Sequence, residues 1–82
     1  MNISRKLAKE YMENYEEREK EAREERRKSV DWELVKRQCS PKQIEAIKLF
    51  VEYRLYEGAA SIAGMTVLDF VELLAELGIS RA

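Results

Sequence analysis

Very few side chains of this sequence are of the types that perform covalent or metal chemistry. The 82 residues include no histidine and a single cysteine, Cys39. Structural zinc sites draw their ligands from several cysteines and histidines, and Ser–His and Cys–His nucleophiles need a histidine as their base. The three glycines are scattered and form no phosphate-binding loop. We therefore expect a protein that is not an enzyme and that uses no cofactor and no metal ion.

Carboxylates at helical spacing are the most distinctive polar feature of the last expected helix, residues 67–77. Asp69, Glu72 and Glu76 recur every three or four residues and form one stripe. The other residues of this helix are apolar, so we expect the three acids to be its only exposed strip. Carboxylates would repel the phosphates of a DNA groove. We interpret the stripe as a docking surface for a basic partner protein; the alternative is a solvated surface that binds nothing.

Basic residues gather around the end of the first expected helix and in the segment after it. If the chain binds operator DNA, we expect contacts from Arg26, Arg27, Lys28, Lys36 and Arg37, with Thr66 at the start of the last helix. Glu24, Glu25 and Glu33 lie among these bases, and the net charge of the chain is −1. Charge alone therefore does not predict nucleic-acid binding.

The first element that must position these groups is a charged helix from Asn2 to about Lys28. Its apolar stripe consists of Ile3, Leu7, Tyr11 and Tyr15, four residues apart, with Ala8 and Met12 beside it. Beyond Tyr15 only Ala22 continues the stripe. This pattern favours a solvated helix whose first half carries an apolar face that can associate with another surface. A long coiled coil is disfavoured because Arg18 and Glu25 would lie in its seam.

Two capping signals follow this helix. Ser29-Val30-Asp31 can cap a short helix that reaches Cys39, although the sequence does not decide whether the long helix is interrupted there. We expect Trp32 to anchor the core and Cys39 to be a buried or half-buried apolar residue, with a disulfide to another chain or a reactive thiol as the alternative. Ser40-Pro41, with Gln43 three residues after the cap, is a clear capping box.

The helix that begins at Pro41 is expected to run to Glu57 and to stop at Gly58. Apolar residues cover most of its circumference, and a chain of this length buries only about 60% of its unfolded surface. We therefore expect a second chain to bury part of the apolar surface of this helix. The residues assigned to the core of this dimer are Ile47, Phe50, Val51 and Tyr53.

The remaining residues match a helix-turn-helix window that starts at Tyr56. Ala60 falls where two helices cross closely, and Gly64 falls where the turn needs a positive φ. Met65, Phe70 and Leu73 occupy packing positions. Thr66 can cap the last helix, after which Gly78 provides a left-handed exit and lets Ile79 fold back on Leu74.

The segments Tyr56–Thr66 and Asp69–Leu74, with Gly78-Ile79, also carry a family resemblance. The Ala-Ala…Ala-Gly-Met-Thr run and the following Phe-x-x-Leu-Leu helix that ends in Gly-Ile resemble a family of small archaeal and bacterial antitoxin-like proteins. The resemblance implies an antitoxin whose toxin is commonly a PIN-domain ribonuclease. Members of this family tend to continue past Gly-Ile into a tail that binds the toxin, whereas the present sequence stops at Ser80-Arg81-Ala82. We expect the long charged first helix to take the place of that tail.

Together these observations predict an all-α protein with a charged helical arm over residues 1–39 and a helix-turn-helix-like core over residues 40–82, assembled as a homodimer. The expected function is to bind and restrain a cognate, toxin-like protein. The alternatives are a transcriptional regulator that binds DNA and a structural oligomerisation module. No apolar run approaches the ~18 residues of a membrane span, so we expect a cytoplasmic protein; its Glu, Lys and Arg content suits a heat-adapted organism.

Overall fold

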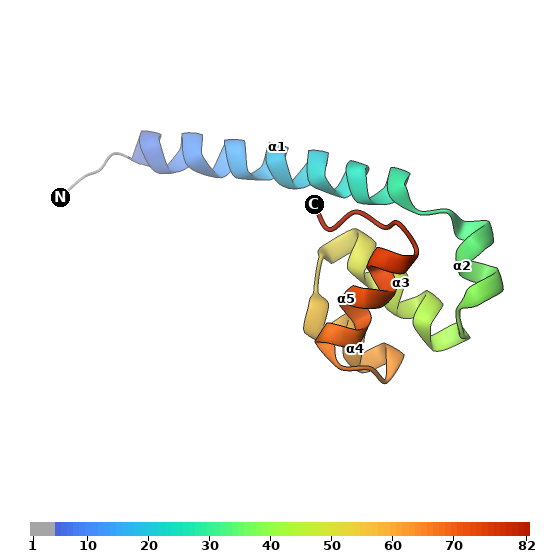
Figure 1. Cartoon of the computed structure of the whole chain (residues 1–82). Helices are drawn as coiled ribbons and strands as arrows, with labels where there is room; N and C mark the ends of the chain where they lie inside the picture. The colour runs from blue at the N-terminus through green and yellow to red at the C-terminus, as the bar shows by residue number, and fades with distance from the viewer. Residues whose placement is uncertain (1–4) are drawn as a thin grey trace.

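The computed structural model describes residues 5–82, with side chains described from Asn14 onward, and the regular secondary structure of this part of the chain is all α-helix (Figure 1). The helices are α1 (Arg5–Ser29), α2 (Trp32–Gln38), α3 (Pro41–Tyr53), α4 (Tyr56–Ala63) and α5 (Val67–Glu76). The all-α prediction is confirmed. The start of the first helix expected at Asn2, and Ile3 of its stripe, lie outside the described residues.

The body of the molecule is built on α3, which packs against α4 and against the last turns of α1. Phe50 lies at its centre with no exposed surface. Its ring makes edge-to-face contacts with Tyr56, at 5.0 Å between centroids, and with Phe70, at 5.9 Å. Val30 and Val35 belong to the same core as these aromatic residues, so α2 is part of this body.

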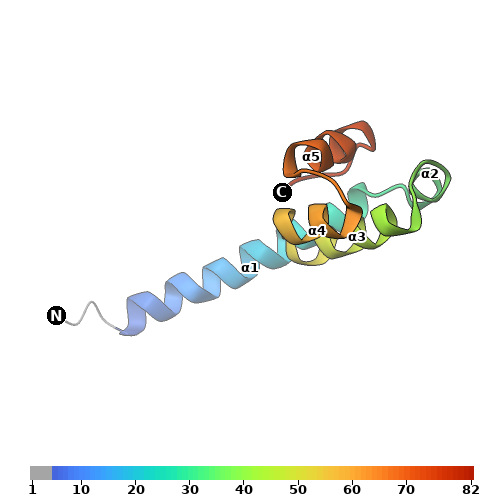
Figure 2. The same cartoon turned by 90° about the horizontal axis from the view of Figure 1, so that it is seen from below.

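The earlier half of α1 extends away from this body, as the two perpendicular views show (Figures 1 and 2). Each residue from Asn14 to Arg18 is exposed, and Tyr15 keeps 58% of its surface accessible. From Asn14 onward, where the side chains of α1 are described, the first half-buried residue is Glu19. The later part of α1, from about Glu19, is therefore the part that packs on the body.

The predicted caps are confirmed. Asp31 accepts a hydrogen bond from the Leu34 amide, so α1 and α2 are separate helices. Ser40 and Gln43 form the reciprocal capping box of α3. At the far end of the chain, the Ile79 amide donates to the Leu74 carbonyl at 2.9 Å, and Gly78 has a φ of 70°. These are the bonds of a Schellman ending.

The predicted end of the third helix is wrong. α3 stops at Tyr53 instead of Glu57, because Arg54 adopts a left-handed conformation with a φ of 54°. This conformation costs a residue with a Cβ roughly 1–2 kcal/mol. It is offset by the Arg54 side chain, whose Nε donates to the Arg81 carbonyl and whose guanidinium lies 5.3 Å from the Tyr56 ring. Gly58 consequently lies inside α4 and ends no helix.

The residues assigned to a dimer core are also placed differently from the expectation. Ile47 and Phe50 are fully buried and Val51 is 3% exposed, all within one chain. Tyr53 is 65% exposed. The cover that we assigned to a second chain comes from α1, α4 and α5 of the same chain, because the break at Arg54 folds α4 back against α3. The side chains of Ile47, Phe50 and Val51 are therefore not available to a partner.

Candidate partner-binding surface

The outward side of α5 carries the three acids singled out in the sequence. Asp69, Glu72 and Glu76 are all exposed, while Phe70 and Leu74 on the opposite side are fully buried. Thr66 fixes the start of this helix, because its hydroxyl accepts a hydrogen bond from the Asp69 amide at 3.1 Å. Asp69 thus lies in the first turn, where a negative charge is stabilised by the helix dipole.

The exposed side of α5 is wider than an acidic stripe, so the prediction that the acids form its only exposed strip is wrong. Leu68 is 69% exposed, Val67 is 40% exposed, and Ala75 is also exposed. The reason is geometric, since α5 lies at the edge of a small body that can cover only one side of it. We call the six residues Val67, Leu68, Asp69, Glu72, Ala75 and Glu76 the α5 surface.

Helical phase divides this surface into two parallel halves. At 100° per residue, Val67, Leu68 and Ala75 fall on one half and the three acids on the other. The ion pairs found among residues 14–82 join Arg26 to Glu19, Arg27 to Glu24 and Glu52, and Lys48 to Glu45. None of them neutralises an acid of the α5 surface. The surface therefore presents negative charge beside apolar area.

Helices α4 and α5 meet at 88° across a three-residue turn. Gly64 occupies the left-handed position of this turn with a φ of 67°. Ala60, at the close crossing, is 2% exposed, and its carbonyl accepts from the Met65 amide. This arrangement has the form of a helix-turn-helix, and it holds α5 with its acids directed away from α3.

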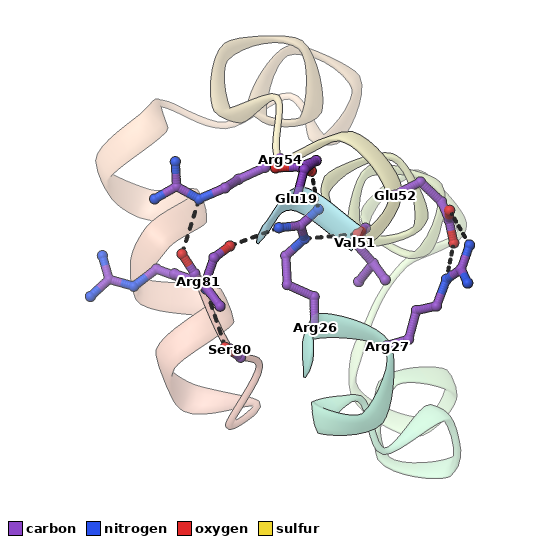
Figure 3. Close-up of polar contacts among 9 residues, drawn as sticks. Glu19, Arg26, Arg27, Val51, Glu52, Arg54, Ser80 and Arg81 are labelled. Atoms are coloured by element: carbon purple, nitrogen blue, oxygen red, sulfur yellow. Dashed lines mark hydrogen bonds and ion pairs between the residues drawn. The ribbon is translucent and has the colours of Figure 1, made fainter. Parts of the chain in front are cut away.

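Arg26, which we assigned to a basic surface, is fully buried, and Figure 3 shows its polar contacts. Its Nε donates to the Val51 carbonyl at 2.8 Å, one terminal nitrogen donates to the Ala82 main-chain oxygen at 2.7 Å, and the other pairs with Glu19 at 3.1 Å. Val51 lies in the last turn of α3, where carbonyls lack a partner within the helix. Arg26 is therefore a structural group, and its assignment to nucleic-acid binding is corrected.

Arg27 is exposed but engaged. Its Nε and one terminal nitrogen donate to the two carboxylate oxygens of Glu52 at 2.9 and 2.7 Å (Figure 3). The other terminal nitrogen donates to Glu24 at 3.0 Å. The hydrogen bond from Arg27 lowers the pKa of Glu52, and the same bond raises the pKa of Arg27. Lys28, Lys36 and Arg37 are exposed. The six residues assigned to DNA thus include one buried base, one paired base and a helix cap, Thr66.

The sequence contained one signal for the burial of Arg26. Arg26 follows Tyr15 by eleven residues and Ala22 by four, which places it on the face of the apolar stripe. A long cation on that face can extend its stem along the body while its guanidinium finds acceptors. The acceptors themselves, Val51 and Ala82, lie 25 and 56 residues further along the chain, and no local pattern predicts these long-range contacts.

Cys39 is half-buried, as expected for a small apolar residue, and burial raises the pKa of its thiol. Trp32 packs partly buried against the core, which confirms it as an anchor.

Within the described part of the chain, no three side chains of Cys, Asp or Glu lie close enough together to hold a metal ion. No single helix among the described residues is long and apolar enough to cross a membrane; α4 and α5 together, bent by 88°, meet that criterion by length and composition alone.

Comparison of the chain with protein-family models, with curated proteins and with solved structures found no match. The function proposed below therefore depends on the surfaces of this chain and on the resemblance carried by its residues.

Proposed function

We propose that this protein is a small, antitoxin-like interaction protein that binds and restrains a cognate protein partner in the cytoplasm. The observation that carries the proposal is the α5 surface, where three exposed acids lie alongside exposed apolar side chains. The resemblance noted in the sequence implies a toxin-like partner, commonly a PIN-domain ribonuclease. The surface adds the chemistry of the contact: the partner presents basic side chains beside an apolar patch.

The two halves of the α5 surface would contribute differently to such a complex. Burial of a leucine side chain stabilises an association by about 1.5–3 kcal/mol, so the apolar half holds the complex together. Charges at the edge of an interface mainly accelerate encounter and select partners of the opposite sign. Protein-binding sites usually combine buried apolar area with polar groups that remain near solvent, and the two halves of the α5 surface supply one of each.

The experiment is to purify the protein with its partner from the native host and to measure the kinetics of the complex with variants. We expect Glu72→Gln with Glu76→Gln to slow association and to reduce its dependence on salt. Leu68→Asp should instead speed dissociation. Glu33→Gln, an exposed acid of α2, is the matched control and should change neither rate. Equal rates for all four proteins would contradict the proposal.

The second candidate function is DNA binding, which the 88° crossing of α4 and α5 favours. The charges weigh against it, since α5 would bring three acids to the phosphates and Arg26 is buried. A mobility shift with operator DNA tests this candidate. Val67→Ala is the better probe, because Thr66→Ala would also remove the cap of α5. A specific shift that Val67→Ala abolishes, with the fold intact, would favour the DNA-binding function.

A further inference from the structure

The connection between α3 and α4 is short and strained. α3 ends at Tyr53 and α4 begins at Tyr56, so only Arg54 and Leu55 join the two helices. Among residues 5–82, Arg54 is the one residue other than glycine that has a positive φ. A residue with a Cβ disfavours this conformation, and such strain persists only where the surrounding structure holds it.

The local sequence does not require a break at this point. From Lys42 to Glu57 it contains no glycine, proline, asparagine, aspartate or serine, and arginine, leucine and glutamate are good helix formers. The start of α4 is also poorly supported, because Leu55 at its N-cap position makes no side-chain hydrogen bond to the helix. The sequence around Arg54 and Leu55 therefore favours one continuous helix.

Two contacts of the Arg54 side chain hold the break. Its Nε donates to the Arg81 carbonyl at 3.0 Å (Figure 3), and its guanidinium lies 5.3 Å from the centre of the Tyr56 ring. Both partners follow the break in the chain. The turn itself is poorly covered, since Tyr53 is 65% exposed and Leu55 is 53% exposed. The fold of α4 against α3 thus depends locally on one exposed cation.

We propose that Arg54 and Leu55 form a hinge that straightens into continuous helix and lets two copies of this chain exchange residues 56–82. In this domain-swapped dimer, α4 and α5 of each copy pack on α1 and α3 of the other. Phe50 keeps its edge-to-face contacts, but the rings of Tyr56 and Phe70 that it touches belong to the second copy. Short connections under strain favour this type of exchange.

The exchange preserves the interior of each body and changes the hinge. Its equilibrium therefore depends on the hinge and on the freedom that two chains lose when they associate. The straight hinge removes the left-handed residue and adds helical hydrogen bonds, at the expense of the Arg54 contacts. It also brings the two hinges together, so the exposed side chains of Tyr53 and Leu55 gain neighbours. The α5 surface stays outward in both forms, so failure of the exchange would not affect the proposed function.

Sedimentation equilibrium of Arg54→Ala and Arg54→Gly tests the hinge. Both variants lose the contacts with Arg81 and Tyr56, but alanine favours the straight helix and glycine favours the left-handed turn. After refolding from urea at high concentration, we expect the dimer dissociation constant of Arg54→Ala to be at least about a hundredfold lower than that of Arg54→Gly. The unmodified protein should form a dimer that is weaker than that of Arg54→Ala. A strictly monomeric unmodified protein, or equal constants for the two variants, would overturn the proposal.

A disulfide across one of the exchanged contacts tests whether the dimer is domain-swapped. Ser29 and Ser80 lie close together, because the Ser80 amide donates to the Ser29 hydroxyl at 2.8 Å. Chains with Ser29→Cys and Ser80→Cys, in a background of Cys39→Ser and Arg54→Ala, are separated into monomer and dimer fractions and oxidised. The monomer should close an intrachain disulfide, and the dimer should form interchain disulfides that survive a denaturing gel without reductant. Intrachain disulfides in the dimer fraction would show association without exchange and would overturn the proposal. Circular dichroism of each variant shows that the fold is retained.

Discussion

Removal of the Arg26 side chain should destabilise this protein far more than removal of its neighbours. Arg26 is fully buried and donates three hydrogen bonds: to the carbonyl of Val51, to the main-chain oxygen of Ala82 and to Glu19. Val51 is in the last turn of α3, and that turn contains no basic residue. The guanidinium therefore supplies both a donor and a positive charge where the helix needs them.

The magnitude follows from two separate losses. A buried acceptor without a donor costs about 1–3 kcal/mol, and truncation of a large buried side chain to alanine adds the loss of its packed stem, so we expect Arg26→Ala to lower the free energy of unfolding by about 3–5 kcal/mol. Arg26→Met retains most of the stem and should cost about 2 kcal/mol, chiefly through the unpaired carbonyl. Small domains are stable by only about 5–15 kcal/mol.

Urea and thermal unfolding followed by circular dichroism measure these changes. For a domain of this size, 1 kcal/mol corresponds to about 4–8 °C in Tm. Arg27→Ala is the matched control, because it removes the same type of side chain one residue later from an exposed position; its effect should be several times smaller. Lys28→Ala should stay within about 0.5 kcal/mol of the unmodified protein. An Arg26→Ala protein as stable as the Arg27→Ala protein would refute the reasoning.

Three further predictions concern two glycines and the surface ion pair. Gly58→Ala should stabilise the protein by about 0.5–1 kcal/mol, because Gly58 lies inside α4 and a Cβ there would meet Leu49 at an ordinary 3.6 Å. Gly64→Ala should destabilise it by about 1 kcal/mol, because Gly64 has a φ of 67°; thermal unfolding of the two variants checks both signs. The lowered pKa of Glu52 contributes stability that is present above its ordinary value of 4.5 and is lost as the pH falls through the lower value of the folded state. Urea midpoints below pH 4.5 should therefore fall more for the unmodified protein than for Glu52→Gln.

The sequence predicted those parts of the fold that depend on short-range signals. The caps at Asp31, Ser40 and Thr66 were correct because each is a bond between residues three positions apart. The exit at Gly78 was correct for the same reason. The end of α3 was wrong because Arg54 adopts a conformation that its side-chain type disfavours, held by contacts with Arg81 and Tyr56.

The candidate site was predicted in part. The exposure of Asp69, Glu72 and Glu76 follows from helical spacing alone, whereas the exposure of Leu68 does not. Leu68 is apolar and lies in an apolar helix, so its type argued for burial. Only the size of the body, which covers one side of α5, decides that it is exposed. The burial of Arg26 likewise depends on acceptors far along the chain.

The central claim is that the α5 surface binds a basic protein, and cross-linking from Leu68 in native cells tests it most directly. A photoreactive phenylalanine analogue replaces Leu68, which is 69% exposed, and in a control protein it replaces Tyr53, which is 65% exposed and lies on α3. The proposal predicts that Leu68, and not Tyr53, cross-links to one basic protein, and that Glu72→Gln with Glu76→Gln reduces the yield. Cross-links from Leu68 to DNA alone, or equal yields of the same protein from both positions, would contradict it.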